Sequence, residues 1–173
     1  MLKICFLAPS EYGKNTAVRL LATKYKIQNI KIAEPLYLLQ DNFYRFIGKK
    51  MTGEQDGELL QYLGKKIRQE NPDFLVRWFF ERLKEFENFD GIISNDDCRP
   101  PDYKFLKDCG FVFIKINGFK RDRLDHTKAD PNSSLEWHKD IKCDYVVDNL
   151  GTIEEYKQNL FELLKKIMSK KGL

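Results

Sequence analysis

Residues 2–16 read LKICFLAPSEYGKNT, an apolar run that passes into a short polar loop and closes on GKNT at 13–16. An apolar strand, a tight loop and a Gly-Lys pair that opens a helix together form a cradle for nucleotide phosphates. Phosphate oxygens need converging backbone N–H groups, a helix N-terminus and a nearby cation, and this stretch offers all three. We therefore expect a strand over 2–7, a helix over 14–25 and phosphate chemistry at the loop between them.

The loop departs from the common phosphate-binding pattern GxxxxGK[ST] at two positions. Ala8 stands where the first Gly belongs, and Ala is the smallest substitute at a position that needs no positive φ. Asn15 stands where a Ser or Thr would ligate Mg²⁺, so that either Thr16 takes over this role or water and carboxylates hold the metal. An ordinary strand-to-helix turn with an exposed lysine is the alternative interpretation. On the phosphate-binding interpretation, the loop residues in contact with the nucleotide are Ala8, Ser10, Gly13, Lys14, Asn15 and Thr16.

Length and composition indicate one globular domain. The chain has 173 residues, of which 42% are hydrophobic and 32% charged, so that it can bury a sizeable core. No apolar run approaches the ~18 residues that cross a bilayer, and residues 1–7 lack the basic segment and cleavage site of a secretion signal. The four cysteines show no CxxC pair and no His at metal-ligand spacing, which is typical of reduced thiols rather than of a zinc site. We expect a soluble, cytoplasmic protein that binds no membrane.

The net charge of +4 is mild. Lysines cluster at 49–50, 65–66 and 165–171, and the last cluster is most simply the solvated end of a helix. We therefore expect a small-molecule partner and no nucleic acid polymer.

Strand-like and helix-like segments alternate along the chain. The apolar spacing predicts further strands at 30–33, 90–95, 111–116 and 144–147. It predicts helices at 35–47, 58–67, 73–86, 101–109 and 153–170, the last capped by Thr152, and a loop at 48–57. Parallel strands need long crossover connections, so this alternation predicts a three-layer α/β fold with a central parallel five-stranded sheet. In such a sheet the ligand lies beyond the carboxyl ends of the strands, where we expect the loops after Leu7, Ala33, Ser94 and Ile116 to converge.

A polar segment, NDDCRPP at 95–101, follows the strand predicted at 90–95. Its carboxylates can hold Mg²⁺ through water or accept substrate hydroxyls, and Arg99 offers a planar fork suited to a phosphate. The alternative is a helix N-terminus whose acids act as caps ahead of a proline. The two interpretations are compatible, and Asp97 and Arg99 are the candidates for a functional site.

Two further groups of polar residues, one at the predicted helix 58–67 and one beyond the fourth strand, are candidates for binding a ligand. Gln61 and Arg68 are seven residues apart, or two helical turns, so that they share one helix face, although they could also simply flank an apolar core stripe. Beyond the fourth strand, Arg121 and Arg123 lie in a charged run that could close over a transferring phosphoryl group, with an ordinary solvated loop as the alternative.

Together these motifs resemble those of the phage and bacterial deoxynucleoside monophosphate kinases, a branch of the P-loop kinases close to dephospho-CoA kinase. GKNT resembles that group's GKDT, and AEPL at 33–36 resembles its ADPL. The order continues with LQYLG at 60–64 and Arg68, with DCRP at 97–100 as in a D-x-R-x-P segment, and with DYVVDNLG at 144–151 as in a terminal strand and N-x-G turn. The resemblance spans nearly the whole chain. The departures from the group's pattern are Ala8, Asn15, Glu34 for Asp, and Tyr37 where a lysine is common.

The resemblance implies a P-loop kinase fold with a single nucleoside monophosphate kinase-like domain over 1–173, an acceptor-binding helical region at about 35–88 and a small lid at about 118–138. It implies transfer of the γ-phosphoryl group of ATP, with Mg²⁺, to the 5′-monophosphate of a (deoxy)nucleoside, and its departures fit a modified nucleotide. The catalytic residues that it implies are Lys14, Asp97, Arg99, Arg121 and Arg123. The implied substrate-binding residues are Glu34, Gln61, Arg68, Trp78, Asp97 and Arg99, and Thr16 would help to hold the metal.

Two alternatives stay open. Another small-molecule P-loop kinase, such as dephospho-CoA kinase, would phosphorylate a hydroxyl and would need a placed carboxylate base. A non-catalytic nucleotide-binding protein is the other alternative, because Ala8 and Asn15 alter the loop. The sequence sets neither the base of the acceptor nor the oligomeric state, for which a homodimer is one option.

Overall fold

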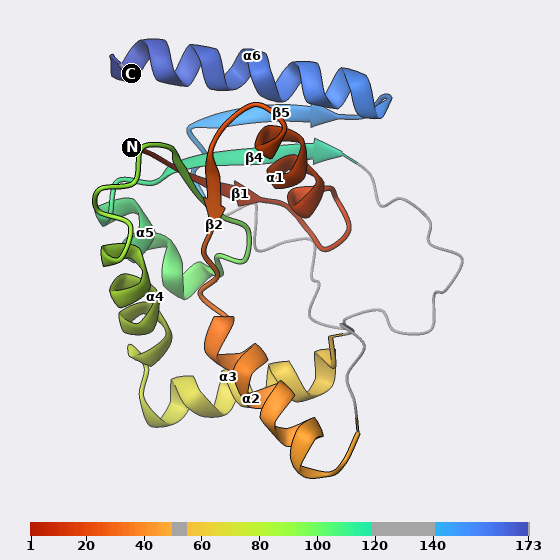
Figure 1. The fold of residues 1–173 in the computed structure, drawn as a ribbon, viewed down its shortest axis with the longest axis vertical. Coiled ribbons are helices and arrows are strands. Elements are labelled where there is room, and N and C mark those ends of the chain that lie inside the picture. Colours follow the sequence, from red (N-terminus) through yellow and green to blue (C-terminus); the bar gives the residue numbers. More distant parts are fainter. Residues whose placement is uncertain (50–54, 119–140, 173) are drawn as a thin grey trace. The chain divides into compact units, whose positions relative to one another are not determined.

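The computed structural model describes residues 1–49, 55–118 and 141–172. The chain forms two compact units, one of Met1–Asn29 with Asn88–Leu173 and the other of Ile30–Glu87 (Figure 1). The first unit contains the sheet, and the second contains three helices. The lid expected at 118–138, including Arg121 and Arg123, lies outside the described residues beyond its first residue, Gly118.

The first unit is built on a five-stranded sheet whose neighbouring strands are all parallel. The strands are β1 (Leu2–Leu7), β2 (Ile27–Asn29), β3 (Ile92–Asn95), β4 (Val112–Gly118) and β5 (Tyr145–Asn149). Their order across the sheet is β2-β3-β1-β4-β5, so that β1 occupies the centre (Figure 1). The predicted α/β fold with a parallel five-stranded sheet is thereby confirmed.

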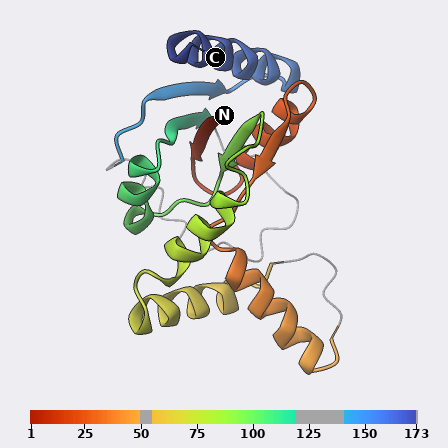
Figure 2. The same cartoon turned by 60° about the vertical axis from the view of Figure 1, so that its left-hand side comes forward.

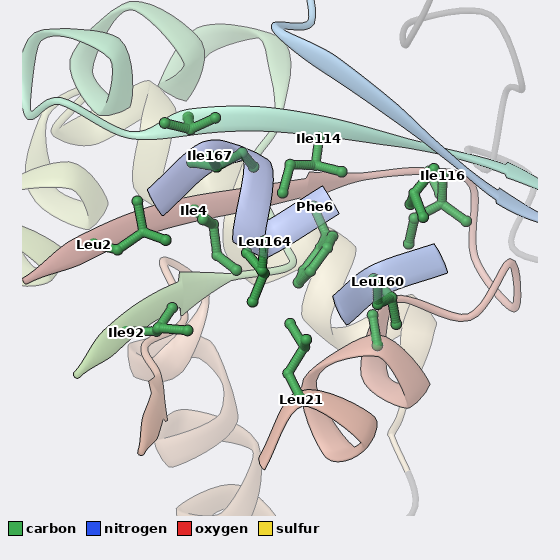
Figure 3. Packing of buried hydrophobic residues seen from close by; sticks show 14 of the residues in the cluster. Leu2, Ile4, Phe6, Leu21, Ile92, Ile114, Ile116, Leu160, Leu164 and Ile167 are labelled. Carbon is green, nitrogen blue, oxygen red and sulfur yellow. The ribbon is translucent and has the colours of Figure 1, made fainter. Parts of the chain in front are cut away.

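One face of this sheet packs against α1 (Lys14–Ala22) and α6 (Ile153–Lys171). Successive side chains of a strand point to opposite faces, so that Ile4 and Phe6 of β1 share this face. They form a buried cluster with Leu21 of α1 and Leu164 of α6 (Figure 3). The cluster therefore holds the helix that follows the loop of residues 8–13 firmly against the central strand.

The opposite face carries α5 (Tyr103–Asp108), which follows a 3₁₀ turn at Pro100–Asp102. The ring of Tyr103 lies 4.6 Å from that of Phe113 in β4, centroid to centroid, and Lys3 Nζ of β1 donates a 3.0 Å hydrogen bond to the Cys109 carbonyl. Figure 2 shows α5 and α6 on opposite sides of the sheet. The first unit therefore has three layers.

The second strand lies three residues before its predicted position. β2 pairs Ile27 with Ile92 and Asn29 with Ser94, and Ser94 Oγ donates to Asn29 Oδ1 at 3.0 Å. The prediction of a strand at 30–33 was wrong, although Ile30 and Ile32, whose alternation suggested it, are buried. Apolar alternation reports which side chains are buried and does not report which backbone groups join the hydrogen-bonded ladder.

The second unit consists of α2 (Glu34–Phe46), α3 (Gly57–Glu70) and α4 (Phe74–Lys84), each ending within three residues of its predicted bounds. Asp56 caps α3, because its Oδ1 accepts a hydrogen bond from Leu59 N at 3.0 Å. Asp56 is tied to α2 twice. Its Oδ2 accepts from the Tyr44 hydroxyl at 2.5 Å, and its backbone N–H donates to Oε1 of the buried Gln40 at 2.8 Å. This network fixes the N-terminus of α3 against α2.

A capping box begins α6, as predicted from Thr152. Thr152 Oγ1 accepts from Glu155 N at 3.2 Å, and Glu155 Oε2 accepts from Thr152 N at 2.6 Å. The hydrogen bond from the Thr152 backbone, followed by that from its hydroxyl, lowers the pKa of Glu155 from its ordinary value of 4.5. Because the folded pKa is the lower one, this stabilisation is complete above pH 4.5 and disappears as the pH falls through the folded value.

We expect Glu155→Ala to lower the melting temperature at pH 7, and we expect this difference to shrink as the pH is lowered below 4.5. Thr152→Ala should cost about 1 kcal/mol at pH 7. Thermal melts followed by circular dichroism between pH 3 and pH 7 test both. Glu162→Ala is the control, because Glu162 is an exposed glutamate of the same helix outside the capping box. An effect of Glu155→Ala that stays constant over this pH range would contradict the account.

Candidate functional site

Residues 8–13 (APSEYG) connect the central strand β1 to the first residue of α1. The loop therefore lies at the carboxyl edge of the sheet, where ligands of parallel sheets bind. The first backbone N–H groups of a helix have no intrahelical acceptor, so that those at the start of α1 can receive an anion. The candidate loop residues range from buried to exposed: Ala8 is buried, Gly13, Lys14 and Thr16 are half-buried, and Ser10 and Asn15 are exposed.

The side chain of Lys14 bends back over the loop. Its Nζ donates to the carbonyl oxygens of Ala8 at 2.6 Å and of Pro9 at 2.7 Å. These acceptors precede Lys14 by six and five residues, so that the lysine side chain reaches back to the first residues of the loop. One positive charge is therefore held at the start of the loop of residues 8–13.

Gly13 has a backbone that other residues would adopt only with strain. Its φ is +97°, in the left-handed region that favours glycine. A Cβ at this position would lie 2.6 Å from Asn149 Nδ2, which is closer than real contacts allow. Glu11 also has a positive φ of +67°, although it is not a glycine. The loop is therefore a tightly curved segment in which only glycine fits at position 13.

Two residues from the end of the first unit contact this loop. Asn149, at the end of β5, donates through Nδ2 to the Tyr12 carbonyl at 3.1 Å. The hydroxyl of Tyr156, in the first turn of α6, donates to the Gly13 carbonyl at 3.3 Å. Neither residue was among the sequence-predicted site residues. The motif DYVVDNLG indicates a turn at Asn149, whereas Tyr156 has the spacing of an ordinary core position in a helix.

The polar segment after β3 is folded by Asn95. The Oδ1 atom of this buried residue accepts from the backbone N–H groups of Asp97 at 3.3 Å and Cys98 at 3.0 Å, and its Nδ2 donates to Asp97 Oδ1 at 2.7 Å. β3 is the neighbour of β1, so that this turn and the loop of residues 8–13 follow adjacent strands at the same edge of the sheet. Asp97 is therefore held in a defined position at that edge.

Two other acids, Asp96 within this segment and Asp102 directly after it, were not among the predicted candidates. Asp96 is only 3% exposed. Burial of a carboxylate costs free energy, and such acids cluster at functional sites. The sequence alone did not distinguish Asp96 from the half-buried Asp97. Asp102, and not an acid of 95–97, forms the cap: its Oδ2 accepts from Arg99 N at 3.1 Å. The side chain of Arg99 is exposed.

The Cys5 thiol, whose Sγ donates to Asn95 Oδ1 at 3.5 Å, is not activated. Burial, together with a hydrogen bond to Cys98, raises the pKa of the Cys5 thiol well above its ordinary 9.0, so that Cys5 is protonated at neutral pH. All four cysteines are free. In the described part of the chain, no group of three or more His, Cys, Asp or Glu side chains is placed to hold a metal ion by itself.

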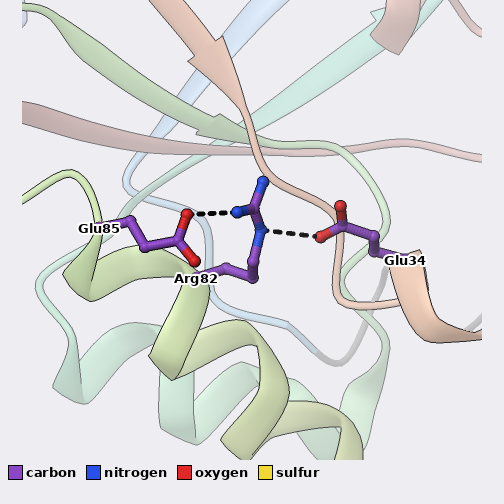
Figure 4. A network of polar contacts seen from close by, with 3 residues as sticks. All are labelled: Glu34, Arg82 and Glu85. Carbon is purple, nitrogen blue, oxygen red and sulfur yellow. Dashed lines mark hydrogen bonds and ion pairs between the residues drawn. The ribbon is translucent and has the colours of Figure 1, made fainter.

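The other predicted substrate-binding residues belong to the second unit. Glu34, the first residue of α2, accepts at Oε2 from Arg82 Nε of α4 at 3.3 Å (Figure 4). Arg82 also pairs with Glu85. The hydrogen bond to Glu85 raises the pKa of Arg82, and the negative charge of Glu34 raises it further. The Glu34–Arg82 pair joins residues 48 positions apart, a contact that no sequence spacing reveals.

Gln61 and Arg68 both lie on α3 and are both half-buried. The buried Gly64 lies between them, and a Cβ added to it would lie 3.3 Å from Leu36 Cδ1 of α2, so that the glycine allows α2 and α3 to pack closely. Trp78 of α4 is 37% exposed, and its ring lies 6.3 Å from that of Phe74. Gln61 and Arg68 therefore lie two turns apart on a continuous helix, which is the spacing that the sequence analysis used to place them on one face.

Comparisons with known proteins establish the fold. No protein-family model matches the chain, and no curated protein sequence matches it. A dephospho-CoA kinase from Campylobacter jejuni has 15% identity and a TM-score of 0.54 over 99% of this chain and 98% of its own. A shikimate kinase from Bacteroides thetaiotaomicron has 17% identity and a TM-score of 0.51 over 95% and 98% of the two chains.

In the described residues, the helices are too short or too polar to cross a lipid bilayer.

A third solved structure, TT1252 from Thermus thermophilus, has 14% identity and a TM-score of 0.57 over 95% of this chain and 97% of its own. At these identities the likeness is one of fold. The chain therefore has the α/β fold of the P-loop kinases.

Proposed function

We propose that this protein transfers the γ-phosphoryl group of ATP to the 5′-monophosphate of a nucleoside, with a deoxynucleotide, plain or modified, as the preferred acceptor. The observation that carries the proposal is the loop between β1 and α1, where Lys14 Nζ bridges the carbonyls of Ala8 and Pro9 next to a left-handed Gly13. The fold of small-molecule kinases supports phosphoryl transfer. The motifs at 33–36 and 97–100 support a nucleotide acceptor.

On the donor side, the backbone around Gly13 would receive the β-phosphate and Lys14 would neutralise charge on the transferring group. Lys14 Nζ now donates to two neutral carbonyl oxygens. An ammonium group is attracted more strongly to a negatively charged phosphate oxygen than to a neutral carbonyl oxygen, so that phosphate oxygens would replace these carbonyls. Lys14 is therefore in place before the nucleotide arrives.

The residues near the loop fit a magnesium ion held largely by water and phosphate. Mg²⁺ binds oxygen and keeps several waters, so that one or two protein ligands suffice. Thr16, a half-buried residue, lies in the first turn of α1, and Asp97 follows the adjacent strand β3. We assign Thr16 as a direct ligand and Asp97 as a ligand through water. Bound there, the ion would neutralise charge on the donor phosphates.

On the acceptor side, we assign Arg68 and Arg99 to the acceptor phosphate and Gln61 to a base edge. Glu34, whose Oε2 is held by Arg82, would contact the sugar or a metal-bound water, and the exposed part of Trp78 would pack against the nucleoside. An acceptor phosphate is already ionised near neutral pH, so that no general base is needed. Positioning and charge neutralisation would set the rate. Arg121 and Arg123 would complete the charge around the transferring group.

A hydroxyl acceptor is the second candidate, favoured by the likeness to a dephospho-CoA kinase over 99% of this chain. Transfer to a hydroxyl requires a base within hydrogen-bond reach of its proton. Glu34 and Asp97 are the carboxylates for that role, and each already accepts a hydrogen bond, from Arg82 and Asn95 respectively. The acceptor must therefore be identified by assay.

We expect a screen with ATP and Mg²⁺ to yield nucleoside diphosphate from at least one deoxynucleoside monophosphate, at a higher rate than from its ribose counterpart. Chromatographic separation of the products measures this, with dephospho-CoA as a parallel acceptor. Equal rates for the two sugars would contradict the deoxy preference. Turnover of dephospho-CoA alone would favour the hydroxyl acceptor, and ATP binding without turnover of any acceptor would indicate a non-catalytic protein.

A further inference from the structure

Two side chains from the C-terminal part of the chain hold the peptide groups of the loop at 8–13, and we infer that Asn149 and Tyr156 are positioning residues for phosphate binding. Their acceptors, the carbonyls of Tyr12 and Gly13, lie 137 and 143 residues earlier in the chain. All four residues belong to the first unit. The inference rests on the proposed function, because it concerns the same phosphate loop.

Asn149 determines which way the Gly13 N–H points. In a trans peptide group, the carbonyl oxygen and the following N–H point in opposite directions. The 3.1 Å hydrogen bond from Asn149 Nδ2 directs the Tyr12 carbonyl toward β5. The Gly13 N–H in the same peptide group is therefore directed away from Asn149, and is available to an anion within the loop.

Tyr156 acts in the same way on the next peptide group. The Gly13 carbonyl accepts from the Tyr156 hydroxyl at 3.3 Å and from Ala17 N at 2.8 Å. These two donors direct the carbonyl toward α6 and into the first turn of α1. The Lys14 N–H, on the opposite side of that peptide group, is therefore also fixed. Two consecutive N–H groups are held in this way, and runs of such groups form anion-binding concavities.

Burial and close packing make this arrangement rigid. Asn149 is 4% exposed and Tyr156 is 1% exposed, so that water competes little for either hydrogen bond. A Cβ on Gly13 would lie 2.6 Å from Asn149 Nδ2 and 3.5 Å from Tyr156 Cε1. The backbone of Asn149 is paired with that of Gly118 in β4. Burial and strand pairing therefore hold Asn149 in place.

Donors that are oriented before binding need no reorganisation when the anion arrives, so that affinity depends on what orients them. We expect Asn149→Ala to weaken binding of inorganic tripolyphosphate and of MgATP about tenfold, the effect of losing one buried hydrogen bond. Tyr156→Phe should weaken binding about threefold, because the Gly13 carbonyl keeps its hydrogen bond from Ala17 N.

The chain offers a matched control for each variant. Asn159 Nδ2 donates to the Asp148 carbonyl at 3.1 Å, and the Tyr103 hydroxyl donates to the Lys142 carbonyl at 3.1 Å. Asn159→Ala and Tyr103→Phe thus remove the same donors from backbone carbonyls outside the loop. Titration calorimetry with tripolyphosphate and MgATP, and a thermal melt of each variant, compare the four proteins with the wild type. We expect wild-type affinity in both controls.

Amide NMR provides a readout that a merely structural role would not change. In the wild type, the Gly13 and Lys14 N–H signals should shift on addition of tripolyphosphate, and in Asn149→Ala the Gly13 shift should be reduced. If Asn149→Ala does not fold, Tyr156→Phe, which removes a single hydroxyl, provides the test with Tyr103→Phe. Wild-type affinity in the folded Asn149 and Tyr156 variants would overturn this inference alone. A wild-type protein that binds neither probe would overturn the proposed function as well.

Discussion

Replacing Lys14 by methionine is expected to lower the rate of phosphoryl transfer by about 10²- to 10³-fold, the usual effect of removing one preorganised charge-stabilising group. Methionine keeps most of the apolar stem of lysine, so that the substitution chiefly removes the ammonium group that bridges the carbonyls of Ala8 and Pro9. A coupled assay of ADP formation, with the acceptor found in the screen, measures the effect.

Lys3→Met is the matched control for this prediction. Lys3 is also a half-buried lysine of the first unit whose Nζ donates to a backbone carbonyl, that of Cys109 at 3.0 Å. It lies on β1 away from the loop, so that its loss should affect the melting temperature and leave turnover within about twofold of wild type. Full activity in Lys14→Met would refute the assignment of the loop as the donor-phosphate site.

Gly13→Ala is expected to lower kcat/KM for ATP by about 10²-fold, the order of loss that a displacement of about 1 Å at a reacting site produces. Alanine at φ +97° is strained by about 1–2 kcal/mol. Its methyl group would also lie 2.6 Å from Asn149 Nδ2, and this amide group cannot move aside without losing its hydrogen bond to the Tyr12 carbonyl. The substitution therefore disturbs the loop through two separate routes.

Gly110→Ala separates backbone strain from crowding. Gly110 has a φ of +81°, but an added Cβ there meets nothing within 4 Å. Gly110→Ala should cost stability comparable to the strain at Gly13, about 1–2 kcal/mol, with unchanged kcat/KM. If Gly13→Ala lost no more activity than Gly110→Ala, crowding against Asn149 would have no part in the function of the loop.

The features that could be predicted from the sequence are those set by local chemistry. An apolar run followed by a glycine and a helix start is a local signal, and β1 begins and ends as predicted. The cap at Thr152 is likewise local, because both of its hydrogen bonds join residues three apart. Helix ends were predicted less closely: α1 ends at Ala22 rather than at the predicted residue 25.

The features that could not be predicted depend on contacts between distant residues. β2 forms at 27–29 because its backbone meets β3 there, which the alternation of Ile30 and Ile32 does not reveal. In the second unit Arg82 contacts Glu34, which lies 48 residues earlier, and in the first unit Asn149 contacts Tyr12, which lies 137 residues earlier. No local pattern distinguishes these partners from other polar residues, since their roles arise only when the fold brings them together.

The most direct test of the central claim is a crystal structure of the protein with Mg²⁺ and a non-hydrolysable ATP analogue. The account predicts phosphate oxygens within hydrogen-bond distance of the Gly13 and Lys14 backbone N–H groups, with Lys14 Nζ moved from the carbonyls of Ala8 and Pro9 onto the phosphates. A triphosphate bound elsewhere, with Lys14 still donating to those two carbonyls, would contradict it.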